Sequence, residues 1–139
     1  MDRYRLAPVR DARTRDEKSR RGDLAVAVGD ARATEEQVAA ALHRVEAARV
    51  AYEAARQIGT LATATALSRA EVYARRKRRD LEAAVAEHQR AEASHAGRLE
   101  AVDAARGQLA RARADREIVE RHFARWRETK RKLAERRED

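Results

Sequence analysis

The sequence contains no cysteine and a single proline, Pro8, among its 139 residues. The lack of cysteine excludes a disulfide framework and a thiolate metal site. No further proline follows to interrupt a helix. Aromatic residues are also scarce, with three tyrosines, one phenylalanine and one tryptophan. These deficits argue against a disulfide-stabilised domain and against an enzyme that needs a deep apolar pocket.

Large apolar residues are few as well. Hydrophobic residues make up 43% of the chain, but alanine supplies 33 of these 60 residues. Alanine buries too little surface to drive the collapse of a compact core, at roughly 25 cal/mol per Å² of apolar area. Charged residues make up 40% of the chain, well above the roughly 25% of an average soluble domain. The composition therefore predicts long helices and argues against a β-sandwich or a Rossmann domain.

The sequence has no long apolar segment. Its apolar runs, such as residues 38–42, are far shorter than the ~20 residues that a transmembrane helix needs. The first residues mix Asp2, Arg3 and Arg5 with no apolar stretch behind them, so we expect no secretory signal. We therefore expect a soluble cytoplasmic protein that reaches a membrane only through its partners.

The formal net charge of +8 lies entirely in the two ends of the chain. Residues 1–21 contain eight basic and four acidic residues, and residues 111–139 contain eleven basic and seven acidic residues, so each end carries +4. Residues 22–110 hold thirteen of each sign. A localised excess of positive charge influences the choice of partner and the rate of encounter.

A seven-residue apolar repeat predicts a coiled-coil helix in the first part of the chain. We expect this helix over about residues 5–58, because Pro8 is favoured in a first turn. Before Leu24 the repeat lapses into charged residues, so that stretch is expected to need a partner or to fray. The seam, the narrow stripe that faces a second helix, consists of Leu24, Ala27, Ala31, Thr34, Val38, Ala41, Val45, Ala48, Tyr52, Ala55 and Gly59.

A second repeat follows an uncharged segment. Residues 59–67 hold one glycine and three threonines, which favour helices little, and Ser68 with Glu71 has the pattern of a capping box. We therefore expect a turn at about 59–67 and a second helix at about 68–136. Two seams flanking a short turn predict an all-α fold, a long two-helix antiparallel coiled-coil hairpin forming one domain. The second seam consists of Leu67, Ala70, Ala74, Lys77, Leu81, Ala84, His88, Ala91, His95, Arg98, Val102, Ala105, Leu109, Ala112, Arg116, Val119, Phe123, Trp126 and Leu133.

Few side chains have spacings that suit chemistry. His88 and His95 share a helix face but lie two turns apart, about 10 Å, too far to bind one metal ion together. There is no Ser/His/Asp grouping and no glycine-rich phosphate loop. We therefore expect no catalysis, no metal ion and no cofactor, and we interpret both histidines as polar residues of the seam.

The basic run at residues 75–79 would suit phosphate groups. Nearby acids such as Asp80 and Glu82 offset its charge, and only Tyr73 is close enough to stack on a base. We therefore interpret the run as a solvated helix face and expect no nucleic-acid binding.

Phe123 and Trp126 lie one turn apart near the C-terminus, among several arginines. One interpretation is that they cap the seam against Tyr4, Leu6 and Val9, which a hairpin brings alongside. The other is that they dock into another protein, because aromatic residues and arginine are enriched among interface hot spots. The two interpretations are compatible.

Both ends of the chain resemble the FliJ/YscO family (SctO), the central-stalk proteins of type III secretion and flagellar export ATPases. The N-terminal residues YRLAPVRDAR resemble the family's opening pattern at Tyr4, Leu6, Val9 and Arg13. The C-terminal residues REIVERHFARWRETKRKLAERRED resemble its charged end. Within them, the ERHF run at 120–123 is more similar to the injectisome branch than to the flagellar one.

The resemblance implies a non-enzymatic stalk with two contact regions. The paired termini would dock in the pore of a hexameric export ATPase through Tyr4, Leu6, Val9, Arg13, Phe123, Arg125 and Trp126. The middle of the hairpin would contact the export gate protein through Val45, Tyr52, Leu81, Ala84 and His88. These five gate positions also belong to the predicted seam.

We therefore expect a stalk of a type III secretion system that promotes the activity of its ATPase and links it to the export gate. Its location would be the cytoplasmic face of the inner membrane export apparatus, and export chaperones are a further class of partner that the resemblance implies. Two alternatives stay open: a basic coiled coil that binds nucleic acid, and a dimerising scaffold in which each chain forms one long helix through Gly59.

Overall fold

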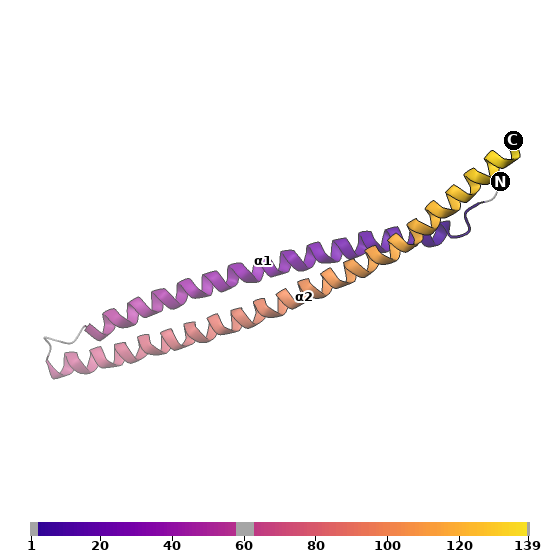
Figure 1. Ribbon diagram of the computed structural model, residues 1–139. Coiled ribbons are helices and arrows are strands. Elements are labelled where there is room, and N and C mark those ends of the chain that lie inside the picture. The colour runs from indigo at the N-terminus through magenta and orange to yellow at the C-terminus, as the bar shows by residue number, and fades with distance from the viewer. Residues whose placement is uncertain (1–2, 58–62, 139) are drawn as a thin grey trace. The chain divides into compact units, whose positions relative to one another are not determined.

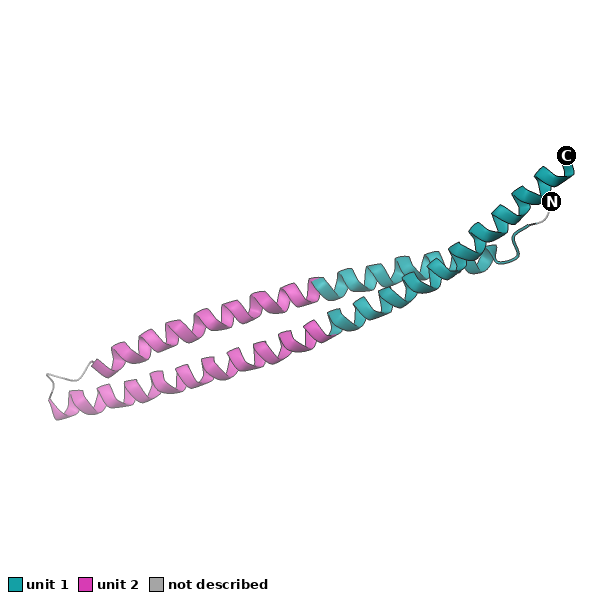
Figure 2. Ribbon diagram, in the orientation of Figure 1, with its two compact units in different colours: residues 1–28, 101–139 teal, residues 29–100 magenta. Residues whose placement is uncertain are grey.

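Two long helices make up almost all of the chain. The computed structural model describes residues 3–57 and 63–138. Helix α1 spans Ala7–Gln57 and helix α2 spans Ala64–Glu138 (Figure 1). No strand occurs among the described residues. The chain divides into two compact units, unit 1 with residues 1–28 and 101–139 and unit 2 with residues 29–100 (Figure 2).

Each unit consists of a segment of α1 packed against a segment of α2. In unit 2, Thr34 contacts His95 and Arg44 pairs with Glu87. Residue numbers therefore rise along α1 while those of its partners on α2 fall, so the two helices are antiparallel. The ion pairs of unit 1 follow the same order. This pairing confirms the predicted all-α fold, a two-helix antiparallel coiled-coil hairpin.

The predicted seam is correct at nearly every described position. On α1 all ten seam residues from Leu24 to Ala55 are buried or half-buried. On α2 the same is true of every predicted position except Leu67, Arg98 and Leu133, which are exposed. Gly59 lies outside the described residues. Because alanine occupies so many of these positions, the two backbones can approach closely.

Charged residues continue the seam where the apolar repeat lapses. Glu17, one heptad before Leu24, is only 6% exposed. Its carboxylate forms ion pairs with Arg116 and Arg113 of α2 and with Arg21 of its own helix. The charged residues 10–23 are helical throughout, and their partner is α2 in unit 1.

A polar contact interrupts the seam of unit 2. The Thr34 hydroxyl donates a hydrogen bond to the Ala31 carbonyl at 2.9 Å and also lies 2.9 Å from Nδ1 of His95. A hydroxyl carries one hydrogen, so Nδ1 of His95 is the donor in the second bond. His95 and His88 are both half-buried in the seam, as predicted.

Helix α2 begins four residues earlier than the predicted residue 68, at Ala64. Thr63 is its N-cap: the Thr63 hydroxyl accepts a hydrogen bond from the Ala66 amide at 3.3 Å, and its carbonyl accepts one from the Leu67 amide at 2.8 Å. A hydrogen bond between the N-cap side chain and the third helical amide is the usual N-cap arrangement. Thr63, which falls in the predicted turn, therefore caps the start of the helix. Residues 58–62 of the predicted turn lie outside the described residues.

Candidate functional site

The short segment before α1 folds onto the C-terminal part of α2 in unit 1. The amide of Ala7 donates a hydrogen bond to the Tyr4 carbonyl at 3.1 Å, which forms a turn ahead of the helix. Tyr4 is 9% exposed, although it lies outside both helices. Tyr4 packs against three rings of α2, and we refer to the four residues together as the aromatic cluster. They are Tyr4, His122, Phe123 and Trp126.

The rings of the aromatic cluster are in mutual contact. Tyr4 packs edge-on against Phe123, with centroids 5.0 Å apart, and lies 5.2 Å from the centroid of Trp126. Phe123 and Trp126 are stacked at 5.9 Å. The Tyr4 hydroxyl and Nδ1 of His122 are hydrogen-bonded at 2.8 Å. Aromatic pairs in such arrangements contribute about 0.5–1.5 kcal/mol each beyond the area they bury.

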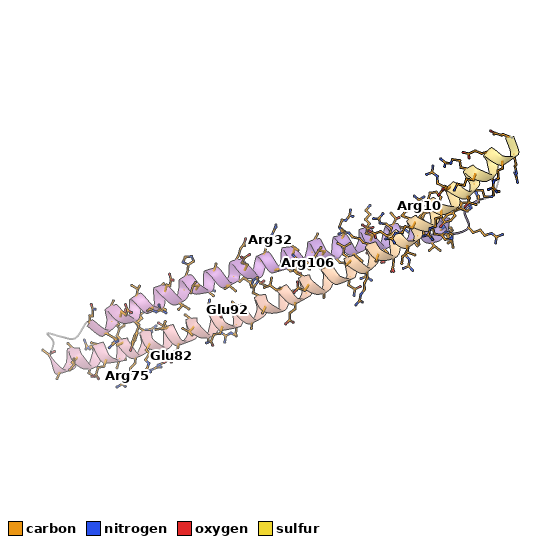
Figure 3. All side chains as sticks on the ribbon, viewed as in Figure 1. Arg10, Arg32, Arg75, Glu82, Glu92 and Arg106 are labelled. Carbon is orange, nitrogen blue, oxygen red and sulfur yellow. The ribbon has the colours of Figure 1, made fainter. Side chains whose placement is uncertain are left out.

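Arg10 connects the aromatic cluster to an ion pair between the helices. Its Nε donates to Oε1 of Glu120 at 2.6 Å and its Nη2 donates to Oε2 at 3.2 Å, so the pair is bidentate. The same guanidinium lies 4.1 Å from the centroid of Phe123, within the range of a cation–π interaction. Arg10 thus contacts both the acid and the ring that α2 presents. Figure 3 labels Arg10 where the first part of α1 lies beside α2 in unit 1.

This geometry shifts the pKa of both partners. The hydrogen bonds from Arg10 lower the pKa of the Glu120 carboxyl below its ordinary value, and partial desolvation opposes this only in part. The same hydrogen bonds raise the pKa of Arg10. Further along α2, a hydrogen bond from Lys132 lowers the pKa of Glu128. The Glu120 and Glu128 carboxylates therefore stay ionised to lower pH than an isolated glutamate.

The predicted docking residues lie together in unit 1, but their exposure differs. Tyr4 is buried, and Phe123 and Trp126 are half-buried, as the capping interpretation predicts for these rings. The other four predicted docking residues, Leu6, Val9, Arg13 and Arg125, are exposed.

The four exposed docking residues differ in their contacts. Leu6 and Val9 are 38% and 40% exposed, and Leu6 lines the same depression as Tyr4 and Trp126. Ring contacts of the kind that the capping interpretation requires are observed for Tyr4. Arg13 pairs with Asp115 at 3.3 Å. Arg125 forms no ion pair with any described residue, and it contributes only its carbonyl to a hydrogen bond from Thr129.

A shallow depression opens beside the aromatic cluster. Basic side chains form much of its lining, and Trp126 and Tyr4 provide its aromatic wall. Cationic side chains around an exposed ring edge suit a segment that carries carboxylates and apolar side chains. The residues that line the depression are Arg3, Tyr4, Arg5, Leu6, His122, Trp126 and Lys130.

The five predicted gate residues lie in the seam of unit 2. Val45 is 5% exposed, and Tyr52, Leu81, Ala84 and His88 are half-buried. They belong to both helices and face the interhelical interface, so little of their surface is available to a partner. The gate contact itself stays a prediction.

No group of three or more histidine, aspartate and glutamate side chains is arranged to hold a metal ion in residues 3–57 and 63–138. Within the same residues, neither helix has an apolar stretch long enough to cross a membrane.

Three residues of the site were not singled out as docking residues from the sequence: Arg10, Glu120 and His122. The sequence does indicate the Arg10–Glu120 pair, because aligning the two chain ends about a central turn brings Arg10 opposite Glu120. A charged residue at a seam position looks like the end of the repeat unless its partner on the other helix is considered.

No family model, curated protein or solved structure matches this chain.

Proposed function

We propose that this chain is a non-enzymatic stalk protein of a type III secretion system, which inserts its paired termini into the hexameric export ATPase and promotes its activity. The proposal starts from the resemblance of both chain ends to the FliJ/YscO family. The observation that carries it is the aromatic cluster, in which Tyr4 of the N-terminal segment contacts Phe123 and Trp126 of α2. Two segments that resemble the family separately therefore form one surface.

The charge of this surface supports docking in an acidic pore. Residues 1–21 and 111–139 carry +4 each, and long-range fields of this kind accelerate the encounter with an acidic partner. After the encounter, half-buried rings flanked by arginine would supply the short-range contacts, because aromatic and arginine side chains dominate interface energetics.

The contacts suggest two roles within the docking surface. Tyr4 and the Arg10–Glu120 pair hold Phe123 and Trp126 in place from within the protein, so we assign them as positioning residues. The exposed residues would touch the ATPase directly. These are Leu6, Val9, Arg13 and Arg125, with the open edges of Phe123 and Trp126.

We further propose that the middle of the hairpin links the ATPase to the export gate protein at the cytoplasmic face of the inner membrane, with export chaperones as additional partners. Because Val45 is buried, a gate contact at the predicted positions would use the half-buried edges of Tyr52, Leu81 and His88.

The proposal is tested by ATPase stimulation. The variant Phe123→Ala/Arg125→Ala/Trp126→Ala, in the full chain, is expected to lose stimulation of the type III export ATPase from the same organism. Its helicity by circular dichroism should be nearly unchanged, because the rest of the seam is intact. The matched control is Arg32→Ala/Leu42→Ala/Val50→Ala, which removes one arginine and two apolar residues that are exposed on α1.

The control should stimulate as well as the unchanged chain. Full stimulation by the first variant would overturn pore docking through this surface. A titration with duplex DNA addresses the nucleic-acid alternative: micromolar or tighter binding at physiological salt, with a steep loss on adding salt, would replace the stalk by a nucleic-acid-binding coiled coil.

A further inference from the structure

The first turns of α2 in unit 2 carry a concentrated positive charge. Residues 69–79 contain six basic residues and one acidic residue, a net charge of +5. Five of the six basic residues are arginine, whose planar guanidinium binds carboxylates through two parallel hydrogen bonds. The helix presents this charge close to its N-cap at Thr63.

Only part of this charge is neutralised within the protein. Lys77 pairs with Asp80 at 3.6 Å and Arg78 pairs with Glu82 at 3.1 Å. Glu87, another nearby acid, pairs with Arg44 of α1. The remaining four arginines of residues 69–79 form no ion pair with any described residue. The four are Arg69, Arg75, Arg76 and Arg79. The arginines of the run at 75–79 are exposed, as expected of a solvated helix face, but within the run the nearby acids pair only with Lys77 and Arg78.

Three of these arginines share a face with two exposed apolar residues. Val72 is 64% exposed and Tyr73 is 45% exposed. They follow Arg69 at spacings of three and four residues, and Arg76 and Arg79 continue the same side of the helix, away from the seam. We refer to Arg69, Val72, Tyr73, Arg76 and Arg79 as the arginine–tyrosine face.

Side chains of this face line one shallow depression. It is formed by Ser68, Arg69, Val72, Tyr73 and Arg76. The Lys77 Nζ lies 5.4 Å from the Tyr73 ring centroid, within the range of a cation–π interaction. An aromatic ring and a valine with arginines on both sides have the composition of an interface hot spot.

The chemistry of the face indicates what covers it. Phosphate groups would satisfy the arginines but would leave Val72 and Tyr73 in water. A protein helix with carboxylates at the positions of the arginines and apolar side chains between them would satisfy both, because apolar burial and ion pairing then occur together. We propose that the arginine–tyrosine face binds an acidic amphipathic helix of a partner protein.

This surface is separate from the sites described above. It shares no residue with the docking surface in unit 1, and none with the five predicted gate positions. The inference therefore stands whether or not the chain docks in an ATPase.

A designed peptide tests the proposal on the full chain. The probe is an alanine-based helical peptide of about 20 residues with glutamates seven residues apart and two leucines between them on the same face. We expect the peptide to bind, and glutamine in place of its glutamates to weaken binding about 10-fold or more. NMR chemical-shift changes on binding should centre on residues 69–79.

Two double variants and two single-site control variants complete the test. Arg69→Ala/Arg76→Ala and Val72→Ala/Tyr73→Ala should each weaken peptide binding about 10-fold. Arg90→Ala and Val50→Ala, at exposed positions elsewhere in unit 2, should leave it unchanged. All four variants replace exposed residues, so helicity is expected to be retained.

Polyanion probes separate the proposal from phosphate binding. Duplex DNA of about 20 base pairs and phosphatidylserine vesicles should bind more weakly than the peptide at physiological salt. Equal or tighter binding of either probe, insensitive to Val72→Ala/Tyr73→Ala, would overturn the inference. Absence of peptide binding, or an equal loss in variants and controls, would overturn it as well.

Discussion

The Arg10 guanidinium donates two hydrogen bonds to the Glu120 carboxylate and lies against the ring of Phe123. One residue near the start of α1 thereby contacts two residues that lie one turn apart on α2. An ion pair alone tolerates sliding of one helix along the other, but a simultaneous ring contact does not. The arrangement therefore fixes the alignment of the two helices in unit 1 beside the aromatic cluster.

The Arg10–Glu120 pair makes stability depend on pH. The pKa of Glu120 is lowered in the folded protein, so the pair adds stability at pH values above the unfolded-state pKa of about 4.3 and loses it as pH falls through the lowered folded value. We predict that Glu120→Gln lowers the melting temperature slightly at about pH 7, because exposed ion pairs contribute little. Thermal melts by circular dichroism should show this difference shrinking below about pH 4.

Glu100→Gln is the matched control for this experiment, because Glu100 is exposed and forms no ion pair with a described residue. It should melt like the unchanged chain throughout. A Glu120→Gln deficit that stays constant down to about pH 3 would contradict the assignment of this carboxylate.

Tyr4 controls the environment of Trp126, the single tryptophan of the chain. We predict that Tyr4→Ala shifts tryptophan fluorescence to longer wavelength and lowers stability by about 1–2 kcal/mol, because it uncovers the indole and Phe123. Tyr4→Phe keeps the ring contacts and loses only the hydrogen bond to His122, so it should cost about 0.5–1 kcal/mol and leave the emission nearly unchanged. Identical spectra for all three chains would show that the N-terminal segment does not cover Trp126.

The buried Glu17 holds three arginines around one carboxylate. We predict that Glu17→Ala destabilises the protein by about 1–3 kcal/mol, because it leaves Arg113 and Arg116 adjacent without their acid. The expected loss is smaller than for a fully buried ion pair, because both arginines are partly exposed to solvent. Glu17→Leu/Arg116→Leu, which extends the apolar seam, should be at least as stable as the unchanged chain.

Urea denaturation measures both effects of Glu17. Glu36→Ala, at an exposed position of α1 without an ion pair to a described residue, is the control and should change stability little. Equal stability of Glu17→Ala and this control would mean that the Glu17 ion pairs contribute nothing.

Thr34 and His95 specify how the helices of unit 2 align. Thr34→Val leaves Nδ1 of His95 without its acceptor in the seam, so we predict a loss of about 1 kcal/mol. Thr34→Val/His95→Leu removes both polar groups and should recover the loss. A buried polar pair specifies the alignment of two helices at a cost in stability. Cysteine cross-linking between the helices should therefore detect shifted alignments in the double variant and not in the unchanged chain. Recovery of stability without shifted alignments would contradict a role of the Thr34–His95 pair in alignment.

The apolar part of the fold follows directly from the sequence. Leucine, valine and alanine repeat every seven residues, and burial of that stripe requires a second helix, so the seam and the antiparallel pairing are both predictable. The start of α2 is harder to predict from the sequence, because threonine suits a turn and an N-cap equally well at position 63. Leu67 was assigned to the seam but is exposed, because α2 begins before the seam does.

The charged part of the fold is harder to predict. Glu17 occupies a seam position, but its burial depends on Arg116 and Arg113, which follow about a hundred residues later. A repeat search based on hydrophobicity cannot recognise such a partner. The same limit applies to Arg10 and Glu120, and to the burial of Tyr4, which belongs to neither helix.

Photo-cross-linking tests the central claim most directly. A photoreactive amino acid at position 125, which is exposed beside the aromatic cluster, is introduced into the full chain and irradiated with the type III export ATPase of the same organism. The same group at position 104, exposed elsewhere on α2, is the control. Our account predicts a covalent adduct with the ATPase from position 125, lost when Phe123 and Trp126 are replaced by alanine, and none from position 104. An absence of adduct from position 125, or equal adducts from both positions, would contradict it.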